Sequence, residues 1–273
     1  MRQAVTDTMD PMWVRACLIG LATLFLAVLL FVPLAGVFLF AFSAGADVFL
    51  RAVSNAETLH AAWLTFLAVA VCIPLNVCFG VAAAWAITRF EFRGKALLVT
   101  LIEVPLAVSP VVAGLMVMLV YGHQGLLGPI LAEYDVKVVF SLPSILIATT
   151  FVTFPLIARE LIPLMRLQGG HEEAAALTLG ASPWRMFFMV TLPKIRWGLL
   201  YGIILCAARA MGEFGAVSVV SGHIRGRTNT LPLHVEILYN EYQFAAAFAV
   251  ASLLALSALV WLTLKSVLEL RTQ

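Results

Sequence analysis

The sequence has few charged residues. Only 12% of its 273 residues are Asp, Glu, Lys or Arg, about half the share usual in soluble domains, and 62% are hydrophobic. The formal net charge of +2 is too small to indicate a nucleic-acid-binding protein. Mean hydropathy is +1.01. We therefore expect a chain that lies mostly within a membrane.

Cysteine is also scarce, and its pattern excludes a metal centre. Cysteines occur only at positions 17, 72, 78 and 206, each within an apolar run, and no C-x-x-C or Cys/His cluster is present. We interpret these residues as small buried hydrophobes.

Catalytic motifs are absent as well. The sequence has no G-x-x-x-x-G-K-[ST] phosphate loop, no G-x-G-x-x-G and no G-x-S-x-G. The string that begins at His171 fails the zinc-protease pattern because position 175 is alanine. We therefore expect no enzyme and no cofactor in this chain. If it works against a gradient, a partner must supply the energy.

Six apolar runs are long enough to cross the hydrocarbon core as helices of about 20 residues. A membrane barrel would show short alternating segments instead. Prolines and glycines inside the runs are tolerated, because neighbouring helices satisfy the freed backbone groups. The prediction is an all-α polytopic membrane protein with six transmembrane helices. They cover roughly residues 16–42, 60–88, 96–121, 141–163, 197–221 and 244–265.

Basic residues predict the orientation. Twelve of the 17 Lys and Arg residues flank the spans on one side, four lie on the other, and Arg209 lies within a span. The richer side should be cytoplasmic, which places both termini inside. Its residues are Arg2, Arg15, Arg89, Arg93, Lys95, Arg159, Arg166, Arg185, Lys194, Arg196, Lys265 and Arg271.

The predicted organisation follows from these spans. It comprises a cytoplasmic segment 1–15, a first transmembrane helix 16–42, a core 59–265 containing a cytoplasmic loop 167–196, and a cytoplasmic tail 266–273. One alternative is that the first span is a cleaved signal, since Ala44-Gly45-Ala46 resembles a cleavage site. Against it, the apolar run is longer than usual, and Asp7 and Asp10 dilute its basic start.

The loop 172–193 is a polar, helix-forming segment between two apolar runs. Residues 172–179 form helix readily and begin with two acids, which the helix dipole favours. Gly180 ends that helix and should adopt a positive φ. Ser182-Pro183 starts a second helix, which Pro193 is expected to stop. From these features alone, a helix pair that only covers the membrane surface is an open alternative.

The pattern Glu-Ala-Ala, glycine, then proline thirteen positions later resembles the cytoplasmic loop of bacterial ABC-importer permeases. The resemblance implies a type I permease fold, in which this coupling helix docks on an ATP-binding subunit. One departure is that Glu173 lies seven residues before Gly180, where the family has six, and Ala174 holds the usual place. The implied coupling residues are Glu172, Glu173, Ala174, Ala175, Gly180, Ala181, Pro183 and Pro193.

Three further segments narrow the resemblance. Residues 208–222, ARAMGEFGAVSVVSG, resemble the fifth helix of oxyanion importers, above all sulfate/thiosulfate permeases. Residues 104–114 resemble their third helix, and 231–238 resemble an external loop of the W-type subunit. The likeness implies an inner-membrane permease that pairs with a T-type permease subunit. It also implies two ATP-binding subunits that carry ATP and magnesium, and a periplasmic sulfate/thiosulfate-binding protein.

Ionisable residues within the spans are candidates for the anion path, because such residues usually face a partner or a cavity. Arg209 and Glu213 lie four apart in the fifth predicted span, so they form either a structural ion pair or part of the path. Ser109, before Pro110, could expose backbone amides or mark a packing kink, and Glu103 could lie at the interface. His123, His223 and His234 are expected to be solvated in external loops.

Alternatives to the sulfate importer remain open at the level of sequence. A molybdate or tungstate permease would use the same architecture. An autonomous channel or an ion-driven carrier would have no need of a docking loop, and such carriers often contain internal repeats, of which no convincing example is present. An intramembrane enzyme would need paired catalytic residues, and the Arg209–Glu213 pair lacks a nucleophile.

Overall fold

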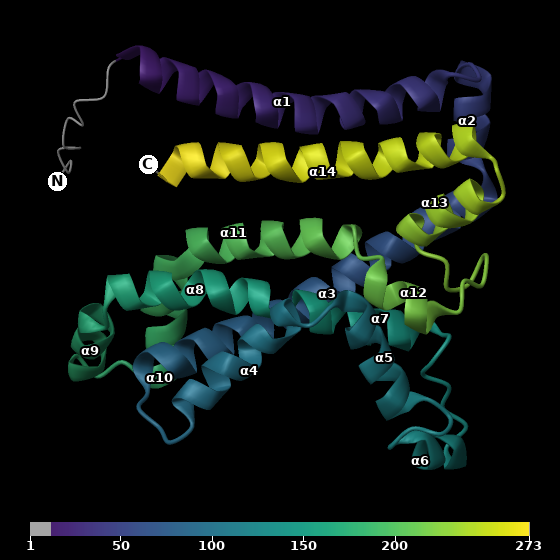
Figure 1. The fold of residues 1–273 in the computed structure, drawn as a ribbon. Helices are drawn as coiled ribbons and strands as arrows, with labels where there is room; N and C mark the ends of the chain where they lie inside the picture. The colour runs from purple at the N-terminus through teal and green to yellow at the C-terminus, as the bar shows by residue number, and fades with distance from the viewer. Residues whose placement is uncertain (1–11, 273) are drawn as a thin grey trace.

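The computed structural model of the protein describes residues 12–272. The expectations for Arg2, Asp7 and Asp10, and for residues 1–11 of the N-terminal segment, lie outside the described residues. Within the described range every regular element is a helix (Figure 1). The helices are α1 (Met12–Phe42), α2 (Ala46–Ser54), α3 (Ala56–Arg89), α4 (Lys95–Ala107), α5 (Pro110–Tyr121), α6 (Gly128–Glu133), α7 (Leu142–Thr153), α8 (Pro155–Gln168), α9 (His171–Thr178), α10 (Pro183–Met186), the π-helix η1 (Phe187–Thr191), α11 (Leu192–Met211), α12 (Gly215–Ser221), α13 (Leu231–Asn240) and α14 (Phe244–Thr272).

Residues 12–272 contain six candidate spans when one bent helix pair is counted as a span, as the sequence predicts. Five are unbroken helical stretches that are long and apolar enough to cross a membrane: α1, α3, Leu142–Gln168, Pro183–Met211 and Phe244–Leu268. The sixth is the pair α4 and α5, which is bent by 109°. The all-α fold with six transmembrane helices is therefore confirmed.

Two spans differ from the continuous helices that the sequence predicts. The span at 96–121 breaks between Ala107 and Pro110, where Val108 and Ser109 are extended with ψ of 136°. Proline lacks an N–H group and disfavours helical backbone at the residue before it, which accounts for the break.

The span predicted at 197–221 also differs from a continuous helix. The helix begins earlier, ends at Met211, and resumes as the short helix α12 at Gly215. Glycines 212 and 215 flank this break, and the backbone between them leaves the helical path.

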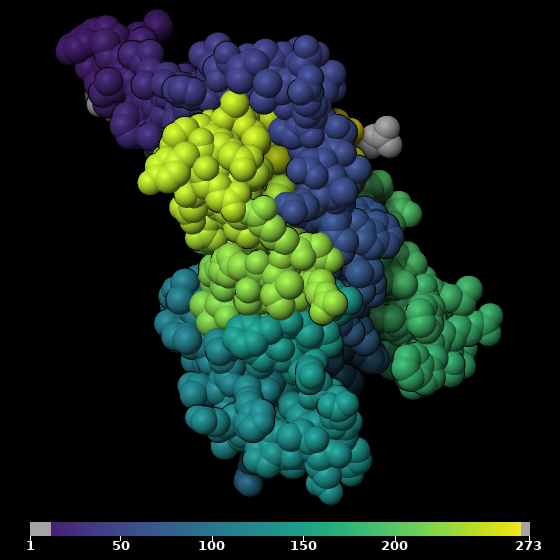
Figure 2. Space-filling model, turned by 90° about the vertical axis from the view of Figure 1, so that its right-hand side faces the viewer, coloured from purple at the N-terminus to yellow at the C-terminus, as the bar shows by residue number. Residues whose placement is uncertain are grey.

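The helices place the loops at two ends (Figure 1). The described start of α1, the end of α14, and the helices α9 and α10 lie at one end, whereas α2, α6 and α13 lie at the other. The first end therefore gathers the loops that the basic residues assign to one side of the membrane. Helix α1 runs beside α14 and is almost wholly exposed, with 6% of its most apolar window buried. Figure 2 shows α1 at one edge of the molecule.

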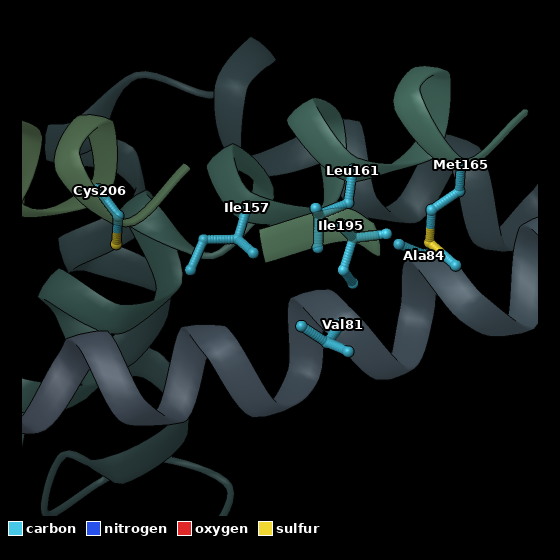
Figure 3. Packing of buried hydrophobic residues seen from close by; sticks show 7 residues of the cluster. All are labelled: Val81, Ala84, Ile157, Leu161, Met165, Ile195 and Cys206. Atoms are coloured by element: carbon cyan, nitrogen blue, oxygen red, sulfur yellow. The ribbon is translucent and has the colours of Figure 1, made fainter. Parts of the chain in front are cut away.

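The principal core lies where α3, α8 and α11 cross (Figure 3). Its fully buried members include Ile157 and Leu161 from α8 and Ile195 from α11. A Cβ at Gly80 would lie 2.7 Å from Cγ2 of Ile157, so only glycine allows α3 and α8 to approach this closely. Small residues at helix crossings stabilise membrane bundles because association there depends on close packing. This core supports the loop formed by α9 and α10.

Candidate functional site

The loop between α8 and α11 has the predicted two-helix form. Gly169, with φ of +64°, ends α8, and α9 follows. Gly180 turns the chain with φ of +87°, which confirms the positive dihedral expected from the sequence. The Ser182 side chain then accepts a hydrogen bond from the N–H of Arg185 and caps α10.

Pro193 does not stop the second helix, contrary to the prediction. It lies in the first turn of α11, and α10, η1 and α11 form one uninterrupted span. The N–H that proline lacks is tolerated in a first helical turn, and the wider π-helical turn precedes it. The loop is therefore helically continuous with the fifth span.

The central contact of the loop joins Arg89 to Glu173. Arg89 is the last residue of α3, and its Nε lies 2.5 Å from Oε2 of Glu173, while Nη2 donates to Oε1 at 3.2 Å. The same guanidinium donates to the carbonyl oxygens of Met165 at 3.1 Å and Gly169 at 2.8 Å. The Thr191 hydroxyl donates to Glu173 Oε1 at 2.9 Å. We call Arg89, Glu173 and Thr191 the loop clasp; it ties together α3, α8, α9 and η1.

A second contact fastens the loop on its outer side. Lys194 Nζ lies 3.0 Å from Oε1 of Glu172, whose side chain is 65% exposed. Lys194 also donates to the carbonyl oxygen of Gln168, and the Gln168 amide donates to that of Lys194, each at 3.2 Å. Because Glu172 is largely solvated, its pair with Lys194 contributes much less to the stability of the loop than the buried clasp does.

The remaining predicted docking residues lie on the surface of the loop. Ala174, Ala175, Gly180 and Pro183 are exposed, and Ala181 is partly buried. Large apolar side chains accompany them: Leu179 is 88% exposed and Trp184 is 73% exposed. A shallow pocket of about 360 Å³ lies beneath Gly180, between α9 and α10. An exposed apolar surface on a polar loop is typical of a protein or membrane interface.

The predicted pair of Arg209 and Glu213 is present, although not on one continuous helix. Arg209 Nη1 lies 2.6 Å from Oε2 of Glu213, and the Glu213 side chain is 1% exposed, against 40% for Arg209. Glu213 lies in the break between α11 and α12, and its Oε1 accepts the N–H of Ala216 at 3.0 Å. The carboxylate thus satisfies the start of α12 while its charge is balanced by arginine.

Ser109 lies at the break that packs against the Arg209 and Glu213 span, whereas Glu103 lies away from it. Ser109 is exposed at the start of α5, which packs on α12; a Cβ on Gly215 would lie 2.9 Å from Cβ of Pro110. The two broken spans therefore meet next to Arg209 and Glu213. Glu103 is exposed on α4, whose main contacts are with α7 and α8, so the structure does not bring it to the pair.

Sequence reasoning missed the role of Arg89 and Thr191. Arg89 was counted only as one more loop charge, and 84 positions separate it from Glu173. A contact between residues so far apart has no local spacing signal. The one available indication is that an arginine ending a span must find carbonyl or carboxylate partners on the same side of the membrane.

His234 is buried, which corrects the expectation of a solvated loop histidine. It is 0% exposed on α13, with Nε2 3.1 Å from the Thr58 hydroxyl and Nδ1 3.2 Å from the Asn229 amide nitrogen. Thr58 itself donates to the carbonyl of Ala52, so the imidazole must donate from Nε2 and accept at Nδ1. Burial lowers the pKa of His234, and the nearby charges of Glu57, Arg225 and Glu241 modify that pKa further.

Arg225 forms the polar surface above His234. It pairs with Glu241 and lies 3.3 Å from Glu57, linking the loop after α12 to both α3 and the end of α13. The hydrogen bond to Glu241 raises the pKa of Arg225. These contacts connect α3, α13 and the loop after α12 at the end of the molecule opposite α9.

Comparison with known proteins places this arrangement in a family. The model of the binding-protein-dependent transport system inner membrane component family matches residues 76–272. The sulfate transport system permease protein CysW of Escherichia coli strain K12 is 49% identical over 96% of this chain and 90% of its own length. The CysW protein of Synechocystis is also 49% identical, over 95% of this chain and 94% of its own.

A second group of permease proteins and a solved structure extend the comparison. The sulfate transport system permease protein CysT of E. coli K12 is 32% identical over 89% of this chain and 88% of its own. A bacterial ABC transporter that imports alginate has a TM-score of 0.77 over 94% of each chain at 14% identity, which shows the fold. The chain therefore belongs to the binding-protein-dependent transport system inner membrane component family, among the CysW permease proteins.

Proposed function

We propose that this chain is a permease subunit of an ATP-driven importer that carries sulfate or thiosulfate across the inner membrane. The observation that carries the proposal is the 49% identity to CysW proteins over nearly the whole chain. The six spans and the anchored loop are what such a subunit requires. We expect this chain to bind no cofactor, and ATP and magnesium to act on a separate subunit.

The exposed surface of α9 and α10 fits an ATP-binding partner. Leu179, Trp184 and the turn at Gly180 project from a loop that the clasp holds against the spans. We expect two copies of the ATP-binding subunit, one for this chain and one for a T-type permease subunit. The similarity to a CysT protein supports such a second permease, since this chain is related to it over 89% of its length. A periplasmic binding protein would deliver the anion to the opposite end.

Coupling in this proposal is mechanical. Closure of the ATP-binding subunits moves α9 and α10, and two rigid connections carry that movement into the membrane. One is the loop clasp, which pulls on the end of α3; the other is the uninterrupted helix from η1 into α11. Helix α11 ends at the break that holds Arg209 and Glu213, so movement of the loop reaches the broken spans.

The half-exposed guanidinium of Arg209 is the proposed cation of the anion path. Although Glu213 pairs with it, the Arg209 side chain is 40% exposed, so part of the guanidinium is open to an anion. Ser109 lies in the break that packs on the same short helix. We place both termini in the cytoplasm, on the side of α9, in agreement with the distribution of basic residues.

Uptake in living cells tests the proposal. A strain that lacks its own sulfate permease subunits should regain uptake of radiolabelled sulfate when this chain is expressed with its T-type and ATP-binding partners. Excess thiosulfate should compete, whereas molybdate and tungstate should compete only weakly. Strong competition by molybdate would instead favour the molybdate or tungstate permease.

A further inference from the structure

The two charges of the Arg209–Glu213 pair differ sharply in exposure. The Arg209 side chain is 40% exposed, whereas that of Glu213 is 1% exposed. Arg209 lies in the last turn of α11, and Glu213 lies in the break before α12. The pair therefore presents its cation outward and keeps its carboxylate on the buried side. The proposed anion path uses the guanidinium alone and gives the carboxylate no part in transport.

The carboxylate of Glu213 is held in place by the backbone around it. Its Oε1 accepts a hydrogen bond from the N–H of Ala216 at 3.0 Å, and its own N–H donates to the carbonyl oxygen of Ala210 at 3.2 Å. The break is closely packed, since a Cβ on Gly215 would lie 2.9 Å from Cβ of Pro110. Glu213 is therefore a fixed negative charge, and an arriving anion does not displace it.

The guanidinium of Arg209 is held less firmly. Oε2 of Glu213 accepts no hydrogen bond from residues 12–272, although Nη1 of Arg209 lies only 2.6 Å away. The contact therefore depends on charge and not on a well-directed N–H···O bond. A guanidinium has five N–H donors arranged as a fork. Those on its exposed side are available to the oxygens of an anion while the ion pair persists.

The fixed carboxylate weakens the attraction of such an anion to Arg209. Within a membrane-spanning bundle the dielectric is low, and Coulomb energy there grows with the product of the charges. An unopposed guanidinium would hold a dianion such as sulfate strongly, but a transport path must bind each ion weakly enough to release it. Glu213 repels the same dianion from behind the guanidinium. Because this repulsion scales with the charge of the anion, it is larger for a dianion than for a monoanion.

We propose that Glu213 sets how tightly Arg209 holds a divalent oxyanion, and thereby how fast the anion is released towards the side of α9. The proposal rests on the proposed function, in which the anion path passes Arg209. Glu213 does not touch the anion; it is a positioning residue that acts through the charge of Arg209.

The test is equilibrium binding of radiolabelled sulfate to the purified complex of this chain with its partner subunits, without the binding protein, together with maximal uptake in proteoliposomes. Glu213→Gln keeps an acceptor for the Ala216 N–H and removes the charge. Sulfate should bind about tenfold more tightly, maximal uptake should fall, and the gain in affinity for monovalent nitrate should be smaller. The matched control Glu91→Gln removes an exposed acid that pairs with Lys95 and should change neither quantity.

Two further variants separate this effect from damage to the fold. Glu213→Asp keeps the charge but withdraws it by one methylene, so it should increase sulfate affinity by a smaller factor; it decides the question alone if Glu213→Gln does not assemble. Arg209→Met with Glu213→Gln should lose the gain, because the cation is absent.

Unchanged or weaker sulfate binding in the assembled Glu213 variants would overturn the proposal, and so would an equal gain in the double variant. Those results would leave the proposed function intact if the unaltered complex still imports sulfate. Failure of the unaltered complex to import sulfate would overturn both.

Discussion

Arg89 Nε lies 2.5 Å from Glu173 Oε2, and this contact joins the end of one transmembrane helix to a helix 84 positions further along the chain. The arginine also binds two carbonyl oxygens at the end of α8. The side chains of Arg89 and Glu173 are only 14% and 8% exposed. The Arg89 guanidinium therefore links α9 and the end of α8 to the end of α3.

The first prediction concerns this clasp. Glu173→Ala should leave Arg89 without its carboxylate and weaken the anchoring of the loop by about 3 kcal/mol, as for other broken buried pairs. Limited proteolysis within 169–182 should accelerate, and co-purification of the ATP-binding subunit should fall. The control is Glu172→Ala, which removes a mostly exposed acid and should cost less than about 1 kcal/mol. Equal effects of the two changes would contradict a role for the clasp.

Gly180 provides the second prediction. Its φ of +87° disfavours a side chain, although a Cβ there would meet no atom within 4 Å. Gly180→Val should therefore cost roughly 1–3 kcal/mol of local backbone strain, leave the permease inserted in the membrane, and reduce both partner binding and uptake. Gly180→Asn adds a side chain that tolerates positive φ and should be much milder. If valine and asparagine behave alike, backbone strain is not the reason for glycine here.

The third prediction separates the two roles of Arg209. Arg209→Ala leaves the buried Glu213 without its cation and should impair assembly. The double variant Arg209→Met with Glu213→Gln keeps an acceptor for the Ala216 N–H and removes both charges. Assembly should return without sulfate uptake if Arg209 belongs to the anion path. Recovery of uptake as well would make the pair structural.

The fourth prediction is a pH dependence at the opposite end of the molecule. Burial lowers the pKa of His234 from its ordinary 6.5, so below that value the unfolded chain binds a proton that the folded chain resists. Stability should therefore be fully present above pH 6.5 and fall as the pH drops towards the folded pKa. Thermal unfolding measured from about pH 7.5 to about pH 5.5 should show this slope. His234→Gln should flatten it; an equally steep slope in that variant would assign it to other groups.

Much of the fold could be predicted because lipid imposes a simple rule on the chain. Apolar runs of sufficient length become helices, and the flanking basic residues group the loops at two ends. The breaks within the transmembrane helices were harder to predict from the sequence. Ser109-Pro110 was visible as a possible kink, but the bend of 109° depends on how α5 packs against α12.

The candidate site likewise has a part that could be predicted from the sequence and a part that could not. Gly180 and Ser182 act through local backbone chemistry, and both behave as their residue types predict. The partner of Glu173 could not be predicted, because the register of its helix does not specify which distant arginine it meets. Likewise, His234 lies in a short segment between spans, and only its tertiary contacts with Thr58 and Asn229 bury it.

We propose that this chain moves sulfate only when a partner hydrolyses ATP. The direct measurement is sulfate uptake into proteoliposomes that contain this chain, a T-type permease, the ATP-binding subunits and a sulfate-binding protein. Uptake should require both ATP and the binding protein, and should be lost when this chain is omitted. Entry of sulfate without ATP, driven by an ion gradient or by its own concentration, would instead identify an autonomous carrier or channel.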